Sequence, residues 1–250
     1  MVRFIRYLIS LLCFFSVYTF AALPDTIASI KPSVVGVGTY NRLAEPNTRF
    51  LGTGFAVLNG TYIATNAHVI PDYLDTQKKE KLIVFVGSGK RTQVKTAEVV
   101  KLDAGNDLAI LKIIGSALPP LVLTTRKVRE GEAIAFTGFP IGAILGLYPV
   151  THTGIISSIT PIVIPARTAR ELTAKQLKQL RNPFMVYQLD ATAYPGNSGS
   201  PVYDQNTGEV IAIVNKVLVK STKESVLSDP SAITYAIPVK HLINLLNTIK

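Results

Sequence analysis

The sequence predicts an all-β fold of antiparallel barrels or sandwiches, closed by one C-terminal helix. Short runs rich in β-branched and aromatic residues recur along the chain, separated by Gly, Pro, Asn and Asp turn signals. At 250 residues with 48% hydrophobic residues, the chain can bury one large β domain or two small ones. Residues 238–249 instead carry apolar residues at helical spacing, which predicts the closing helix.

The strands are expected to follow one another through nearly the whole chain. Asn59-Gly60 is typical of a hairpin turn between two of them. Polar residues and Pro46 predict a loop over 41–50. The expected strands are 33–40, 51–58, 61–65, 81–86, 92–101, 108–113, 132–137, 154–159, 184–189, 200–203, 210–219 and 233–236.

Three segments interrupt this strand pattern. Residues 25–30 can form a short helix capped by Asp25. Residues 166–180 have a charged helical pattern and are expected to be an exposed insertion. Pro119-Pro120 predicts a connector, and therefore a boundary between two halves of the chain.

The N-terminus has the pattern of a secretory signal peptide. Arg3 and Arg6 precede an apolar run over 7–20, and small residues follow at a suitable cleavage point. We therefore expect residues 1–21 to be removed after Ala21. An uncleaved membrane anchor is the alternative, although the apolar run is short for a membrane span.

Composition argues against several classes of function. The formal net charge is +10, but lysines are spread over many segments without interleaved aromatic residues, which favours a solvated basic surface over a nucleic-acid groove. Cys13 lies within the predicted signal peptide, so the mature chain would hold no cysteine and need no disulfide. The three histidines lie on separate elements, so we expect neither a metal site nor a cofactor.

Ser198 is the candidate nucleophile of the chain. It lies in the glycine-containing turn 194–201, where the backbone can bend sharply and leave room for a substrate carbonyl. The same turn can direct the N–H groups of Gly196 and Ser198 at one point, as an oxyanion requires. A serine hydroxyl is a weak nucleophile alone, so this interpretation needs a histidine base and an acid.

His68 is the candidate base, because it follows the expected strand 61–65 at the start of a loop. His152 lies within a β-type stretch, and His241 lies on the terminal helix at an expected surface position.

Asp107 is the candidate acid, since it directly precedes the apolar run 108–113, where a dry carboxylate can orient an imidazole. Asp103 is a rival in an expected loop. Asp190 is close in sequence to Ser198 and is expected to form a wall or to anchor a loop.

Four motifs together resemble the trypsin-like serine peptidases, and the order His, Asp, Ser matches that family. The resemblance implies a chymotrypsin-like pair of six-stranded antiparallel barrels. Residues 22–118 would carry His68 and Asp107, and residues 121–250 would carry Ser198 and the terminal helix. The motifs are Gly52-Thr53-Gly54-Phe55, Thr65-Asn66-Ala67-His68-Val69, Asp107-Leu108-Ala109-Ile110-Leu111 and Gly196-Asn197-Ser198-Gly199-Ser200-Pro201.

Within this family, the chain is most similar to the HtrA/Deg type of bacterial envelope protease. The segments 31–35 and 137–142 resemble its first strand and its regulatory loop. Two features depart from that type. Ser200 stands where the family has a second glycine after the nucleophile, and the chain ends at Lys250 without the usual PDZ domain.

The resemblance implies a Ser-His-Asp acyl-enzyme mechanism, with protein or peptide substrates and no cofactor. His68 would take the proton of Ser198, and Asp107 would fix its tautomer. The alternative is a latent or chaperone-like binder on the same fold. We expect a periplasmic or secreted protein with no nucleic-acid partner and no stable membrane anchor, and the sequence leaves oligomerisation open.

The resemblance also places the primary specificity pocket. None of its expected wall residues is charged, so we expect cleavage after small or medium apolar residues, not after Lys, Arg or Glu. By position, these wall residues are Thr192, Ala193, Ile213, Val214 and Asn215.

Overall fold

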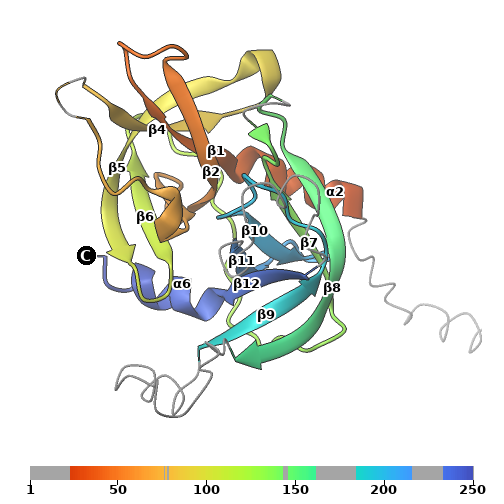
Figure 1. Ribbon diagram of the computed structural model, residues 1–250. Coiled ribbons are helices and arrows are strands. Elements are labelled where there is room, and N and C mark those ends of the chain that lie inside the picture. The colour runs from red at the N-terminus through yellow and green to blue at the C-terminus, as the bar shows by residue number, and fades with distance from the viewer. Residues whose placement is uncertain are drawn as a thin grey trace, which may run out of the picture.

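A computed structural model of the chain describes residues 23–75, 77, 79–142, 146–161, 184–215 and 233–249. These residues form two closed antiparallel β-barrels, which confirms the fold class expected from the sequence (Figure 1). The first barrel contains β1 (Val34–Tyr40), β2 (Thr48–Val57), β3 (Tyr62–Thr65), β4 (Lys81–Val86), β5 (Gln93–Asp103) and β6 (Leu108–Ile113). The second contains β7 (Ala133–Gly138), β8 (Val150–Pro161), β9 (Met185–Asp190), β10 (Pro201–Asp204), β11 (Val210–Asn215) and β12 (Ile233–Pro238).

The strand order places the ends of β3 and β6 side by side. Around the first barrel the order is β1-β2-β3-β6-β5-β4, and around the second it is β10-β11-β12-β9-β8-β7. β2 and β3 form the hairpin predicted from Asn59-Gly60, where Gly60 has a φ of +81° that suits glycine. β3 then pairs with β6 so that Thr65 lies opposite Ala109. This register brings the residues after Thr65 close to those before Ala109.

Two strands begin several residues earlier than the sequence predicted. β2 begins at Thr48, within the predicted loop 41–50, because Thr48 pairs with Tyr40 of β1. β8 begins at Val150 and includes His152, which lies opposite Phe136 of β7. Both extensions carry polar residues without a clear apolar alternation, so cross-strand pairing defines them rather than local hydrophobic pattern.

The N-terminal helix α2 (Leu23–Ile30) packs against the second barrel before the chain enters the first (Figure 1). Asp25 lies in its first turn, so the prediction that Asp25 caps the helix was wrong. The chain continues through Pro32 in a 3-10 turn, η1 (Lys31–Ser33). Ile30 joins a buried cluster with Val34, Ala135, Phe139 and Tyr203.

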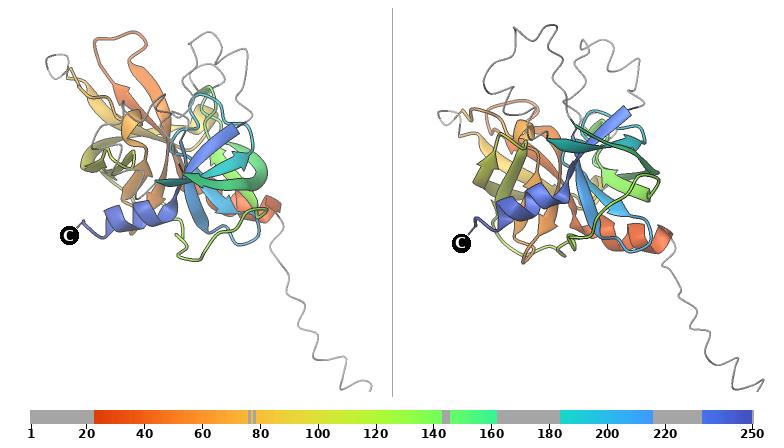
Figure 2. Two further views of the ribbon diagram at one scale, coloured as in Figure 1. Left: turned by 60° about the horizontal axis from the view of Figure 1, so that its bottom comes forward. Right: turned by 90° about the horizontal axis from the view of Figure 1, so that it is seen from below.

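The C-terminal helix α6 (Val239–Leu246) leaves β12 and runs beneath the first barrel (Figure 2). Its apolar face belongs to a core cluster that draws residues from both barrels, so the helix fastens one barrel to the other. The buried members of this cluster are Phe55, Val57, Ala64, Leu108, Ile110, Val210, Ile213, Ile237, Val239, Leu242, Leu245 and Leu246.

Among the described residues, no helix has the length and apolar character needed to cross a membrane. The predicted signal peptide over 1–21 and the predicted insertion over 166–180 lie outside the described residues.

Candidate active site

His68 and Asp107 lie against each other at the ends of β3 and β6. His68 is the central residue of a 3-10 turn, η2 (Ala67–Val69), and Asp107 directly precedes β6. Nδ1 of His68 lies 2.7 Å from Oδ2 of Asp107, and the backbone N–H of His68 donates to Oδ1 at 2.9 Å. Because an ionised carboxylate only accepts, Nδ1 of the neutral ring carries the proton and Nε2 is left as an acceptor.

Two asparagines hold Asp107 in this position. Its φ is +52°, an uncommon conformation for a residue with a side chain. Asn66 Nδ2 donates to the carbonyl oxygen of Asp107 at 3.0 Å, and Asn215 Nδ2 of β11 donates to Oδ2 at 2.9 Å. Asn215 therefore contacts the acid from the second barrel. The motif containing Asn66 was visible in the sequence, but neither asparagine was identified in this role.

The rival aspartates have other surroundings. Asp103 Oδ1 accepts from the N–H groups of Gly105 and Asn106 at 3.0 and 3.1 Å, so this carboxylate shapes the turn that leads to Asp107. Asp190 is exposed at the end of β9.

Ser198 lies in a tight turn of the second barrel. Gly196 and Gly199 have φ values of +98° and +88°, which explains why glycines flank this turn. Within it, the Asn197 N–H donates to the Tyr194 carbonyl at 3.0 Å, and the Ser200 N–H donates to the Asn197 carbonyl at 3.0 Å. Ser198 is 9% exposed, so only a small part of its surface is accessible to a substrate.

The Ser198 turn is hydrogen-bonded to β2, the first strand of the hairpin that leads to His68. The Thr53 N–H of β2 donates to the Ser198 carbonyl at 2.9 Å. A Cβ atom added at Gly52 would stand 2.8 Å from Val69 and 3.1 Å from the Ser198 carbonyl oxygen. Gly52 thus lies between Ser198 and the residue that follows His68, and the missing side chain allows the close approach of the two segments.

Two backbone N–H groups of the turn are available to a ligand. Among the described residues, neither the Gly196 N–H nor the Ser198 N–H has a hydrogen-bond partner in the protein. The carbonyl of Pro195, which shares a peptide unit with the Gly196 N–H, accepts from the Ile141 N–H at 2.7 Å. Since the two groups of a trans peptide point in opposite directions, this bond directs the Gly196 N–H away from Ile141.

The five residues expected in a specificity pocket have unequal positions. Ala193 is buried beside the second-barrel core, and its N–H donates to Thr234 Oγ1 at 3.0 Å. Ile213 has no exposed surface and belongs to the cluster between the barrels, because β11 is flanked by β10 and β12. Its side chain therefore packs in the core and lines no surface pocket, which corrects the expectation.

Of the other expected wall residues, Asn215 contacts Asp107, and Thr192 and Val214 lie nearer to Ala193. Thr192 is partly buried, while Val214 has no exposed surface and shares the second-barrel core with Ala193. The Thr234 hydroxyl also donates to the Ala191 carbonyl, so one buried threonine fixes the backbone on both sides of Thr192. This residue was not recognised in the sequence, because nothing local links it to the segment 191–193.

The two remaining histidines are separate from His68. His152 stacks on Phe136 with ring centroids 4.8 Å apart and faces Tyr194 at 5.9 Å. Burial lowers the pKa of His152, and burial with the nearby Lys240 lowers the pKa of His241. His241 was expected on the surface, but its Nε2 atom is buried, because the ring packs against Phe184. In the described part of the chain, no three His, Cys, Asp or Glu side chains form a cluster that could hold a metal ion.

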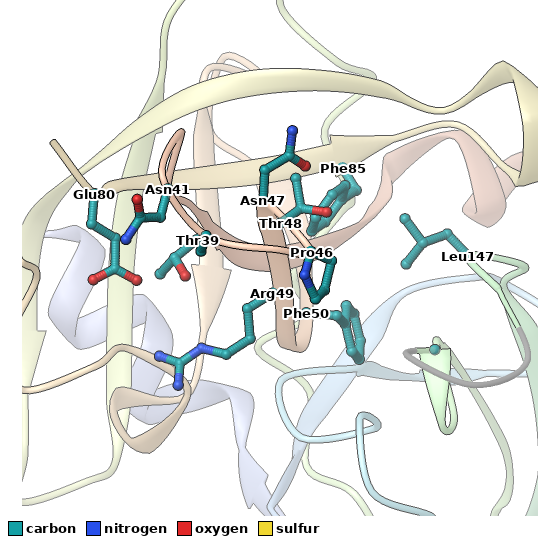
Figure 3. Close-up of a pocket in the computed structure, with 12 residues that line it drawn as sticks. Thr39, Asn41, Pro46, Asn47, Thr48, Arg49, Phe50, Glu80, Phe85 and Leu147 are labelled. Atoms are coloured by element: carbon teal, nitrogen blue, oxygen red, sulfur yellow. The ribbon is translucent and has the colours of Figure 1, made fainter. Parts of the chain in front are cut away.

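A cavity of about 590 Å³ lies between the β1–β2 loop and Leu147 (Figure 3). Phe50 lines this cavity, and its ring lies 6.3 Å from that of Phe139 in an edge-to-face arrangement. The same ring would be 2.9 Å from a Cβ atom at Gly196. Phe50 thus separates the cavity from the turn.

Comparisons with known proteins agree with this geometry. The family model described as "Trypsin-like peptidase domain" matches residues 52–213. A probable DegP-like periplasmic serine endoprotease of Halomonas elongata is 32% identical over 174 residues, which are 69% of this chain and 31% of the relative. The serine protease HTRA1A of Danio rerio is 31% identical over 202 residues, covering 78% of this chain and 37% of that protein.

Solved structures share the fold. The serine endoprotease of Yersinia pestis gives a TM-score of 0.62 at 27% identity, covering 92% of this chain and 66% of that one. The active form of the Rv3671c protease of M. tuberculosis gives a TM-score of 0.64 at 22% identity, covering 90% and 83%.

The chain spans about a third of the length of the first curated relatives it matches. The names of these curated relatives confirm the predicted resemblance to HtrA/Deg-type proteases. The family model covers the segment from Gly52 through His68, Asp107 and Ser198 to Ile213. This chain therefore belongs to the trypsin-like peptidase domain family.

Proposed function

We propose that the protein is a serine endopeptidase in which Ser198 is the nucleophile, His68 the general base and Asp107 the acid that orients it. The observation that carries this proposal is the pairing of both Asp107 oxygens with His68, together with a serine in the other barrel beside two N–H groups that have no partner among the described residues. These are the parts that acyl transfer to a serine requires.

In the acylation step, Nε2 of His68 takes the proton from the Ser198 hydroxyl as Oγ bonds to the substrate carbonyl carbon. The N–H groups of Gly196 and Ser198 donate to the developing oxyanion. Asp107 stabilises the imidazolium without taking its proton. The imidazolium then protonates the leaving amine as the peptide C–N bond breaks, which leaves an ester on Ser198.

In deacylation, water replaces the amine at the ester carbonyl. His68 removes one proton from that water as its oxygen attacks, and the same two N–H groups hold the second oxyanion. Collapse of this intermediate breaks the ester bond, and His68 returns the proton to Ser198 Oγ. The peptide acid leaves, and the enzyme regains its starting protonation state.

We propose that substrates carry a small or medium apolar residue before the cleaved bond. Thr192 and Ala193 supply an uncharged wall, and the Thr234 hydroxyl holds their backbone. Val214 is also uncharged, but it is buried in the second-barrel core behind this wall. A peptide-library profile should be dominated by residues such as Ala, Val or Leu before the cut, and a profile dominated by Arg or Glu contradicts this specificity.

We further propose that the protein is exported and acts in the periplasm or outside the cell. The basic and apolar N-terminus supports this, as does the periplasmic location in the names of several relatives. N-terminal sequencing of protein recovered from the envelope should begin at Ala22, whereas an intact N-terminus on membrane-bound protein supports the anchor instead.

A latent or chaperone-like binder on the same fold is the second candidate, favoured by one observation. In the described part of the chain, the Ser198 hydroxyl has no hydrogen-bond partner, so its bond to His68 would have to form on substrate binding. Such bonds are often long in unliganded enzymes and tighten with substrate. Peptide binding without hydrolysis by the wild type would favour the binder.

Hydrolysis of casein and of short peptides by the wild type and by Ser198→Ala tests the proposed peptidase. We expect the substitution to lower kcat by about 10⁵-fold or more, because it removes the acylating oxygen. Equal folded stability of the two proteins, measured by thermal unfolding, is the control. Wild-type turnover by Ser198→Ala contradicts the assignment of the nucleophile.

A further inference from the structure

Thr53 lies where the first barrel meets the Ser198 turn, and it has no exposed surface. Its hydroxyl donates to the Gly196 carbonyl at 2.7 Å and accepts from the Phe139 N–H at 3.0 Å. One side chain of β2 thus connects two separate segments of the second barrel. The one O–H donor and one of the two lone pairs of this hydroxyl are engaged with buried backbone groups.

The backbone of Thr53 also forms hydrogen bonds, one to the Ser198 turn and one to β3. Its N–H donates to the Ser198 carbonyl at 2.9 Å, and its own carbonyl accepts from Thr65 Oγ1 at 2.7 Å. Thr53 therefore holds the carbonyls of Gly196 and Ser198, the two residues whose N–H groups face the proposed oxyanion. Thr65, at the end of β3, holds Thr53 in turn.

Three consecutive peptide units determine where those N–H groups point. The first unit consists of the Pro195 carbonyl and the Gly196 N–H, and its carbonyl accepts a hydrogen bond from the Ile141 N–H. The third unit consists of the Asn197 carbonyl and the Ser198 N–H, and its carbonyl accepts a hydrogen bond from the Ser200 N–H. The middle unit, with its carbonyl at Gly196, joins them.

The carbonyl of this middle unit is held by the Thr53 hydroxyl, whereas backbone N–H groups hold the other two carbonyls. Rotation of the middle unit changes ψ of Gly196 and φ of Asn197, and so changes the angle between the first and third units. Glycine offers little steric resistance to such a rotation, which the Thr53 bond opposes together with the bond from the Asn197 N–H to the Tyr194 carbonyl. The side chain of Thr53 is thus placed to fix the angle between the peptide units that carry the two N–H groups.

The hydrogen bond between the Thr53 hydroxyl and the Phe139 N–H supports the first peptide unit, which carries the Gly196 N–H. Thr53 Oγ1 accepts from the Phe139 N–H, and Phe139 lies two residues before Ile141 in the segment that holds the Pro195 carbonyl. The packing is close here, because a Cβ atom at Gly196 would stand 2.3 Å from the Phe139 carbonyl oxygen. A displacement of Phe139 would therefore be transmitted to the peptide unit that carries the Gly196 N–H.

From this geometry we infer that the Thr53 hydroxyl is a positioning residue for the oxyanion-binding N–H groups of Gly196 and Ser198. This inference rests on the proposed function of those groups. Thr53 does not touch the reacting atoms. It acts through the backbone of the turn, and it couples the barrel that carries the base to the turn that carries the nucleophile.

Three variants test this role against a purely structural one. Thr53→Val keeps the shape of the side chain but removes the hydroxyl, and Thr53→Ser keeps the hydroxyl. Thr137→Val is the matched control, since Thr137 is equally buried and its hydroxyl lies 2.8 Å from both Thr151 Oγ1 and Tyr203 OH, with no contact to the turn. Both valine variants lose a buried hydroxyl with two partners and should be destabilised to a similar extent.

We expect Thr53→Val to lower kcat by about 10- to 100-fold with KM changed less than threefold, because an oxyanion donor acts in the transition state and its complete loss costs about 100- to 1,000-fold. Affinity for a peptide aldehyde, which forms a tetrahedral adduct on Ser198, should fall by a similar factor. Thr53→Ser should recover most of both losses, and Thr137→Val should show neither. A kcat of Thr53→Val equal to that of Thr137→Val, or no recovery in Thr53→Ser, overturns the inference.

A second readout separates this inference from the proposed function. The amide ¹H and ¹⁵N resonances of Gly196 and Ser198 report the geometry of the turn whether or not the protein hydrolyses peptides. They should shift in Thr53→Val, return in Thr53→Ser and stay in place in Thr137→Val. If the Thr53→Val resonances coincide with those of the wild type, Thr53 does not position the turn. If they shift while the wild type shows no hydrolysis, the inference about geometry stands and the peptidase proposal fails.

Discussion

The two halves of the candidate active site are held in different ways. On the base side, the His68–Asp107 pair is fixed mainly by groups of its own barrel, namely the short hydrogen bond between the two side chains, a backbone N–H and the Asn66 amide. On the nucleophile side, the turn around Ser198 depends on Thr53 of the other barrel for two of its carbonyl contacts.

This difference indicates which parts of the candidate active site each barrel supports. The first barrel builds the acid–base pair and also supports the turn of the second barrel. The second barrel returns one contact to the pair, through Asn215 and Asp107. Separation of the barrels would therefore disturb the nucleophile turn more than the acid–base pair, and the following substitutions test each side.

The largest effect is expected from Asp107→Asn on the base side. An amide at this position donates where the carboxylate accepts, which favours the wrong tautomer of His68 and places Asn215 opposite another donor. We expect kcat to fall by about 10⁴-fold with the fold retained. Peptide hydrolysis and circular dichroism measure the two quantities. A loss below about tenfold would mean that Asp107 does not orient the base.

Gly138→Ala should damage the nucleophile side through packing. A Cβ atom at Gly138 would stand 2.0 Å from Ser200 Oγ, 2.9 Å from Asn197 Oδ1 and 3.0 Å from Thr53 Oγ1. We expect a loss of about 1–3 kcal/mol of unfolding free energy, as for other overpacked cores, together with a lower kcat. Chemical denaturation and peptide hydrolysis provide the measurements.

A companion substitution makes this test specific. Ser200 Oγ is buried without a hydrogen-bond partner in the described part of the chain, so Ser200→Ala alone should keep the unfolding free energy or raise it by up to about 1 kcal/mol. Combined with Gly138→Ala, it removes the closest collision and should restore part of the lost stability. Strict additivity of the two changes contradicts the proposed clash.

Asn66→Ala should have a smaller effect on the base side. The Asn66 amide holds the Asp107 carbonyl, and that residue has a positive φ whose retention depends on its surroundings. Loss of one buried hydrogen bond costs about 1–2 kcal/mol, so we expect a kcat decrease on the order of tenfold with little change in KM. The His68 ring-proton resonances should shift as well. Unchanged kcat and unchanged resonances would show that Asp107 holds its position without Asn66.

The smallest expected effect is on the pH dependence of stability, through His152, whose ring lies beside Tyr194 of the Ser198 turn. Because burial lowers the pKa of His152 in the folded protein, the unfolded chain binds more protons as pH falls below about 6.5. The stability linked to His152 is thus complete above that pH and is lost as pH falls through the lowered folded pKa. His152→Phe keeps the ring stack on Phe136 and should reduce the slope of unfolding free energy between pH 7 and 5 by up to one proton.

Denaturant titrations at several pH values measure that slope. The remaining dependence should include His241, whose pKa burial also lowers. An identical slope in the wild type and in His152→Phe would mean that the His152 ring is protonated equally in the folded and unfolded states.

Much of the fold could be predicted from local sequence. The Asn59-Gly60 hairpin and the apolar run after Asp107 have local signals, and they place both His68 and Asp107 at neighbouring strand ends. The extension of β8 back to Val150 has no such signal, because pairing with β7 creates it.

The residues that hold the site in place were also hard to predict, because their partners are distant in sequence. Thr53 and Gly196 are 143 residues apart, and Asn215 and Asp107 are 108 residues apart. Nothing in the neighbouring sequence marks a threonine as the partner of a distant carbonyl. Ile213 was misplaced because alternation along β11 does not reveal that the junction with the first barrel covers this part of the strand.

The central claim is that Ser198 forms a covalent acyl-enzyme with the help of His68 and Asp107. Labelling of the purified protein with a fluorophosphonate, followed by mass spectrometry of the digested product, tests it most directly. We expect one adduct on Ser198 in the wild type, none in Ser198→Ala and much slower labelling in Asp107→Asn. Labelling of Ser198→Ala at the wild-type rate, or an adduct on another residue, would contradict the assignment.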